Sequence, residues 1–121
     1  MAKILLAEHN PFLINIYAAE LRKLGHSVSI ANDGEIAISR LKSLNPDLII
    51  LDAGLSKING FDVLKIIKRD LWMSNLKIVM ISDYENEDKI RHSIGLGIEK
   101  HLFKAENTAK DIADEVKILL S

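Results

Sequence analysis

The chain has 121 residues, of which 48% are hydrophobic and 27% charged, with a formal net charge of −1 and no cysteine. This composition predicts one packed domain, residues 1–121, and it excludes disulfides and thiolate metal sites. It argues against nucleic-acid contact, which needs a clustered basic surface, and no segment reaches the roughly 18 apolar residues of a membrane helix. We therefore expect a soluble, cytoplasmic domain that binds neither nucleic acid nor membrane.

Short apolar runs alternate with helical patterns along the whole chain. Lys3 to Ala7 predicts a strand, and Asn10 followed by Pro11 predicts the cap and first position of a helix that ends at Gly25. Further strands are expected at residues 27–31, 48–51, 77–81 and 97–103. Further helices are expected at residues 34–44, around 63–67, at 85–94 and at 107–120.

Five strands that alternate with five helices predict a doubly wound, mostly parallel α/β sheet. In such folds, ligands bind beyond the carboxyl ends of the strands. The polar residues that follow the strands therefore form the candidate site, and they are Glu8, His9, Asp52, Ser82, Asp83 and Lys104.

The residue types in this set suit phosphoryl chemistry with a divalent cation. Carboxylate oxygens are ligands for Mg2+, a lysine ammonium offers a point charge to a phosphoryl oxygen, and a serine hydroxyl donates a hydrogen bond. The alternative is that each residue is a solvated loop residue or a cap, because strand ends expose polar residues in many folds.

Four stretches resemble the receiver domain of two-component response regulators: KILLAEHN, PDLIILDAGLSKINGFDVLK, IVMIS and FK. Together they extend the resemblance over essentially the whole chain. It implies a flavodoxin-like fold with strand order 2-1-3-4-5. It also implies a signalling module that is no enzyme beyond its own phosphorylation and dephosphorylation, and that works as a monomer or weak dimer.

The resemblance implies a role for each site residue. Asp52 would be the phosphoacceptor, taking a phosphoryl group from a phosphohistidine of a sensor histidine kinase or phosphotransfer protein. Mg2+ would bind Asp52, Glu8 and the carbonyl of Gly54. Ser82 would be the switch hydroxyl and Lys104 the phosphoryl-binding lysine. The switch would change binding to a downstream protein that the sequence does not identify.

One departure from the family's usual pattern lies in the acidic pocket. His9 stands where the family usually has Asp, so we expect weak Mg2+ binding, because Mg2+ coordinates nitrogen poorly. Two positions are open to His9: between Glu8 and Asp52 as a fixed cation, or pointing away as a capping or packing residue. We favour the outward position, since an outward imidazole needs no special partner.

Three further departures concern the switch. Asp83 follows the switch hydroxyl, where small residues are usual. Ala105 follows Lys104, where a proline with a cis bond is usual, so we expect a trans bond and a lysine that reaches the site less rigidly. His101 stands at the aromatic switch position. We expect its ring to stay outward on a partner-facing surface, because burying it without a hydrogen bond is costly.

Three functions are open from these residues. The first is a phosphorylatable receiver, and the second is a pseudo-receiver that acts as a phosphorylation-independent protein-interaction module. A stable acyl phosphate formed with a small phosphodonor would separate the two. The third is a flavin-binding flavodoxin, which needs a hydroxyl- and glycine-rich loop after the first strand. The sequence EHNPF supplies neither, and a missing flavin absorbance would exclude this function.

Overall fold

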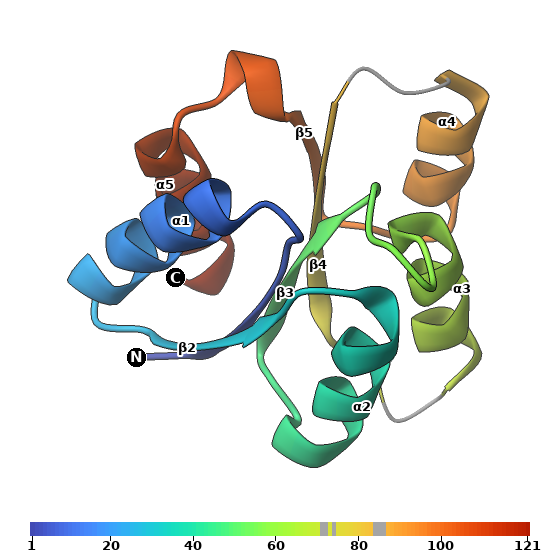
Figure 1. Cartoon of the computed structure of the whole chain (residues 1–121), viewed down its shortest axis with the longest axis horizontal. Helices are drawn as coiled ribbons and strands as arrows, with labels where there is room; N and C mark the ends of the chain where they lie inside the picture. The colour runs from blue at the N-terminus through green and yellow to red at the C-terminus, as the bar shows by residue number, and fades with distance from the viewer. Residues whose placement is uncertain (71–72, 74, 84–86) are drawn as a thin grey trace.

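The computed structural model describes residues 1–70, 73, 75–83 and 87–121, which form a five-stranded parallel sheet (Figure 1). The strand order is β2-β1-β3-β4-β5, so the predicted flavodoxin-like topology is confirmed. The strands are β1 (Lys3–Ala7), β2 (Ser27–Ala31), β3 (Leu48–Asp52), β4 (Lys77–Ser82) and β5 (Lys100–Phe103).

Helices cover both faces of this sheet. They are α1 (Pro11–Lys23), α2 (Gly34–Leu44), α3 (Gly60–Arg69), α4 (Glu87–Gly95) and α5 (Ala109–Leu120). The first and last lie on one side of the sheet and the other three on the opposite side (Figure 1). The expected start of the fourth helix at Glu85 lies outside the described residues. None of the described helices combines the length and the apolar character needed to cross a membrane.

Alternating side chains of the strands fill two hydrophobic cores. In β1, Ile4 and Leu6 pack with α1 and α5, whereas Leu5 and Ala7 pack with α2 and α3. All of β3 is buried, because this central strand has helices on both sides. Burial of each large aliphatic side chain contributes about 1.5–3 kcal/mol, so the central strands hold the residues at their ends firmly in place.

The boundaries of the elements follow local capping chemistry. Asn10 caps α1 as predicted, because its side-chain oxygen accepts two backbone N–H groups of the first turn. The last helix begins at Ala109 rather than at residue 107, because Thr108 is its cap and forms a capping box. The fifth strand begins at Lys100 rather than at residue 97, because Gly97 has a φ of +95°, which does not continue a strand.

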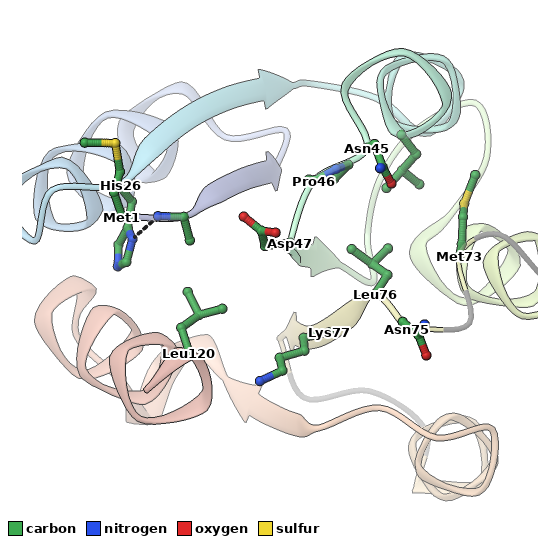
Figure 2. Close-up of a pocket in the computed structure, with 12 residues that line it drawn as sticks. Met1, His26, Asn45, Pro46, Asp47, Met73, Asn75, Leu76, Lys77 and Leu120 are labelled. Carbon is green, nitrogen blue, oxygen red and sulfur yellow. Dashed lines mark hydrogen bonds between the residues drawn. The ribbon is translucent and has the colours of Figure 1, made fainter.

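The amino ends of the strands border a cavity of about 670 Å³ (Figure 2). Its lining includes Asp47, just before β3, and Lys77, the first residue of β4. Nδ1 of His26 accepts the backbone N–H of Ala2 at 3.3 Å, and Oδ2 of Asp47 accepts that of Lys3 at 2.7 Å. The polar groups at this end thus serve the backbone, and the predicted site residues lie at the opposite end of the sheet.

Candidate functional site

A cluster of three charged side chains lies at the carboxyl ends of the strands β1, β3 and β5. Glu8 directly follows β1, Asp52 is the last residue of β3, and Lys104 directly follows β5. Nζ of Lys104 lies 2.8 Å from Oε1 of Glu8 and 3.1 Å from Oδ1 of Asp52. The side chains of Glu8, Asp52 and Lys104 are 0%, 2% and 8% exposed, so this ion pairing takes place away from water. Three of the predicted residues therefore come together as expected.

The charge state of Lys104 follows from its surroundings. Burial alone lowers the pKa of this ammonium, but the hydrogen bond that it donates to Glu8 and the charge of Asp52 outweigh burial and raise the pKa above its ordinary value. The lysine is therefore a fixed cation at neutral pH. With two buried carboxylates against one ammonium, the cluster depends on Lys104 to offset their mutual repulsion.

Backbone amides hold the two carboxylates in place. Oε2 of Glu8 accepts the N–H groups of His9 and Asn10 at 2.8 and 2.9 Å. Oδ1 of Asp52 accepts the N–H of Gly54 at 3.0 Å. Hydrogen bonds from backbone N–H groups to ionised acceptors are short and strong, so both side chains have one fixed orientation.

His9 turns into the site, and the expected outward position is wrong. Its Nδ1 lies 2.5 Å from Oδ2 of Asp52 and 3.3 Å from Oε2 of Glu8, although the side chain is 47% exposed. The physical reason is that Lys104 pairs with the other oxygen of each carboxylate. The remaining two oxygens therefore face the imidazole, which donates its N–H to Asp52.

Ser82 and His101 form a second pair next to the charged cluster. Ser82 is buried at the end of β4, and its Oγ lies 2.8 Å from Nε2 of His101 in β5. The imidazole also packs edge-on against Phe103, with 4.8 Å between ring centroids. Burial lowers the pKa of His101 below its ordinary value, so the ring is neutral near pH 7.

The expected outward position of His101 is therefore wrong as well. The expectation was based on the cost of burying a polar ring without a hydrogen bond. The hydroxyl of Ser82 supplies that hydrogen bond, and the ring of Phe103 supplies apolar contact, so the cost does not arise.

The loop after β5 carries Ala105 where the family usually has a proline. The structure has no cis peptide bond among its described residues, so the predicted trans bond between Lys104 and Ala105 is confirmed. A 3₁₀ turn, η2 (Lys104–Glu106), directly follows β5. With this trans bond, Lys104 still reaches the site and contacts two buried carboxylates, and the expectation that it does so less rigidly stays a prediction. Ala105 and Asp83 are exposed and take no part in the cluster.

Sequence reasoning missed two residues that shape the site. Gly60 begins α3 beneath Asp52, and a Cβ there would lie 2.2 Å from the Asp52 carbonyl oxygen. Tyr17 of α1 is buried, and burial together with the charges of Glu8 and Asp52 raises its pKa to about 12. In the sequence, Gly60 is marked only by its place after Asn59, a residue type that caps helices, and Tyr17 is marked only by its helical spacing from apolar residues.

The pocket offers donor atoms for a metal ion, but not the set that Mg2+ prefers. Glu8, His9 and Asp52 each present one donor atom, and these atoms lie within 4.8 Å of one another. Mg2+ favours cages of oxygen atoms and water, whereas one of these three donors is an imidazole nitrogen. The residues therefore fit Mg2+ poorly.

The parallel sheet in the order 2-1-3-4-5, with an acidic pair, a lysine and a hydroxyl at its carboxyl end, defines a flavodoxin-like domain of the receiver class. A family model described as the response regulator receiver domain matches residues 4–117, and the chain belongs to this family. Members take part in two-component signalling, where they interact with histidine kinases or phosphotransfer proteins. They are generally signalling modules rather than enzymes.

Curated relatives are full-length regulators of greater size. The alkaline phosphatase synthesis transcriptional regulatory protein PhoP of Bacillus subtilis is 28% identical over 98% of this chain and 48% of its own length. The gliding motility regulatory protein of Myxococcus xanthus is 25% identical over 94% of this chain and 15% of its own length. The chain thus spans less than half the length of these relatives.

Two solved structures of response regulators have the same fold as this chain. The Mn2+-bound response regulator Rcp1 is 28% identical, with a TM-score of 0.84 over 98% of this chain and 91% of its own. The phosphorylated cyanobacterial phytochrome response regulator RcpA is 31% identical, with a TM-score of 0.83 over 98% and 90% of the two chains.

Proposed function

We propose that residues 1–121 act as one phosphorylatable receiver domain and that Asp52 accepts the phosphoryl group. The donor is a phosphohistidine on a sensor histidine kinase or a phosphotransfer protein. The observation that carries this proposal is the buried Asp52 carboxylate, which lies 3.1 Å from the ammonium of Lys104. The carboxylate also lies at the carboxyl edge of the parallel strands, where folds of this class bind their ligands. The similar receiver RcpA, described in its phosphorylated form, supports the same role.

The two oxygens of Asp52 have different surroundings, and we assign the attack to Oδ2. Oδ1 is engaged by Lys104 and by the N–H of Gly54, whereas Oδ2 contacts His9, which is half exposed. In the transfer, a bond forms between this oxygen and phosphorus, the bond between phosphorus and the donor nitrogen breaks, and that nitrogen takes up a proton. Lys104 offsets the negative charge gathered at the acceptor, so catalysis is positioning and electrostatics.

The Ser82–His101 pair is the proposed switch. A phosphoryl group on Asp52 would compete for the Ser82 hydroxyl, which is now bonded to His101. Loss of that bond would free the imidazole and alter the surface around β5, where a downstream protein would bind. We also propose that this domain itself does not contact nucleic acid and that it is a monomer or weak dimer.

Weak Mg2+ affinity is part of the proposal. The donor set of Glu8, His9 and Asp52 contains one nitrogen, and the imidazole already contacts both carboxylates. When bound, a divalent cation would offset negative charge at the acceptor. The carbonyl of Gly54, two residues past Asp52, would be a further ligand.

A second candidate function is a pseudo-receiver that signals without aspartyl phosphate. The observation in its favour is that both oxygens of Asp52 are engaged by protein groups, with His9 only 2.5 Å from Oδ2. In this function the domain would be a protein-interaction module with a permanently closed acceptor.

Intact-protein mass spectrometry after incubation with a small acyl phosphate separates the two functions. The receiver gains the mass of one phosphoryl group, slowly without Mg2+ and little faster with it, and Asp52→Asn gains none. Asp83→Asn is the matched control, because Asp83 is an exposed neighbour of the site, and it should label as the wild type does. Equal labelling of Asp52→Asn would exclude Asp52 as the acceptor. No labelling of the wild type would favour the pseudo-receiver.

A further inference from the structure

We propose that Glu8, His9 and Asp52 form a binding site for a divalent transition-metal ion that accepts imidazole nitrogen, such as Ni2+ or Zn2+, in preference to Mg2+. The proposal goes beyond the acceptor role of Asp52, because it concerns the unphosphorylated chain and holds whether or not that residue takes a phosphoryl group. Its basis is the mixed donor set, in which two buried carboxylates meet one imidazole.

The arrangement of the donor atoms favours a shared ion. Lys104 contacts Oε1 of Glu8 and Oδ1 of Asp52, so Oε2, Oδ2 and Nδ1 of His9 are left on the side away from the lysine. Ligands bound to one ion at about 2.0–2.2 Å stand roughly 3–3.5 Å apart. The separation between His9 Nδ1 and Glu8 Oε2 is already 3.3 Å.

The contact between His9 and Asp52 must open before an ion can bind, and His9 is the most exposed of the three side chains. Nδ1 of His9 is 2.5 Å from Oδ2 of Asp52, closer than two ligands of one ion. The His9 side chain is 47% exposed, whereas the two carboxylates are buried and held by backbone N–H groups. Withdrawal of the imidazole therefore opens space for an ion among the three donor atoms, which all lie within 4.8 Å of one another.

Charge and donor chemistry then select the ion. Two carboxylates against one ammonium leave one negative charge in the pocket when the imidazole is neutral, so a cation is attracted. Mg2+ demands oxygen ligands and gives up its water reluctantly, whereas sites with nitrogen and oxygen donors bind Ni2+ and Zn2+ more tightly than Mn2+. The imidazole of His9 is thus the residue that decides selectivity.

Isothermal titration calorimetry of the unphosphorylated chain with Ni2+, Zn2+ and Mg2+ tests this site. We expect one Ni2+ per chain, bound at least tenfold more tightly than Mg2+. His9→Asp should weaken Ni2+ binding at least tenfold and tighten Mg2+ binding. His26→Gln and His92→Gln are matched controls, because each removes an imidazole far from the acidic pair, and both should bind Ni2+ as the wild type does.

Two results would overturn the proposal: Ni2+ affinity that is unchanged in His9→Asp, or wild-type binding of Mg2+ that equals or exceeds that of Ni2+. A second measurement does not depend on any variant. Ni2+ is paramagnetic, so a substoichiometric amount should broaden the backbone amide signals of residues 8–9 and 52–54 first, and broadening around His26 or His92 instead would contradict the site. Labelling of Asp52 by a phosphodonor is measured separately, so it can succeed where metal binding fails.

Discussion

The two ends of the parallel sheet carry similar polar residues but use them differently. At the amino end, Asp47 accepts a backbone N–H of β1, and Lys77 donates to a backbone carbonyl of α5. At the carboxyl end, Lys104 instead lies between the side chains of Glu8 and Asp52. Charged side chains therefore bond to the backbone at the amino end, whereas at the carboxyl end they pair with one another.

The difference separates a structural role at the amino end from the functional role that we propose for the carboxyl end. Asp47 is exposed and satisfies one backbone donor, which costs the fold little. Glu8 and Asp52 are buried as like charges, an arrangement that costs free energy and that Lys104 offsets only while it keeps its place. A fold has no need of such a cluster for its own stability, which supports the proposal that this end of the sheet carries the chemistry.

Replacing one lysine at each end should produce the largest effect and test the contrast directly. Lys104→Met leaves two buried carboxylates without their ammonium and should lower the free energy of unfolding by about 3 kcal/mol. Lys77→Met loses a single hydrogen bond to a carbonyl and should cost about 1 kcal/mol or less. Urea unfolding of both variants measures the difference. If Lys77→Met were the more damaging change, the contrast between the two ends would be wrong.

Replacing one glycine at each end should separate damage to the site from damage to the fold. Gly60→Ala places a Cβ 2.2 Å from the Asp52 carbonyl oxygen and should cost about 1–3 kcal/mol. Gly25→Ala meets nothing within 4 Å but must adopt a φ of +90°, at about 1–2 kcal/mol. Thermal unfolding should show a loss in both variants. Only Gly60→Ala should also change the rate at which a phosphodonor labels the chain, and equal rates would argue that the Asp52 backbone is not constrained by Gly60.

The smallest effect should come from two partly buried histidines, which make the free energy of unfolding depend on pH. Burial lowers the pKa of His101 at the carboxyl end and of His26 at the amino end below 6.5. The unfolded chain therefore binds more protons between each folded-state pKa and 6.5, and stability falls as the pH drops through that window. His101→Gln and His26→Gln should each reduce this acid destabilisation in pH-dependent urea unfolding.

The same two imidazoles also report on the proposed switch. Adding a small phosphodonor should shift the nuclear magnetic resonance signals of the His101 ring, because its Ser82 partner is drawn away. The ring of His26 bonds to the backbone of Ala2 at the far end of the sheet and should not respond. Equal shifts at both rings, or none at His101 in a labelled chain, would contradict the proposed switch.

Most of the fold could be predicted from the sequence, because its signals are local. In a chain whose apolar runs alternate with helical patterns, the unbroken apolar run from Leu48 to Leu51 predicts a central strand covered on both faces. The cap at Asn10 fixes the start of α1 in the same direct way. The convergence of Glu8, Asp52 and Lys104 then follows from topology, since parallel strands bring their carboxyl ends to one edge.

The positions of His9 and His101 could not be predicted, because each depends on a partner that is distant in the sequence. His9 turns inward because Lys104 leaves one oxygen of Asp52 free for it. His101 turns inward because Ser82, from the neighbouring strand, supplies a buried hydroxyl. Residue preferences describe the cost of burying an imidazole but not the partners that remove that cost.

The most direct test of the acceptor is to locate the phosphoryl group on β3. Cleavage after lysine yields a peptide of residues 43–57 that contains Asp47 from the amino end and Asp52 from the carboxyl end. The chain is treated with a small phosphodonor, the acyl phosphate is reduced with borohydride, and tandem mass spectrometry finds the reduced residue. We predict modification of Asp52 and none of Asp47. Modification of Asp47, or of a peptide outside residues 43–57, would contradict the assignment of Asp52 as the acceptor.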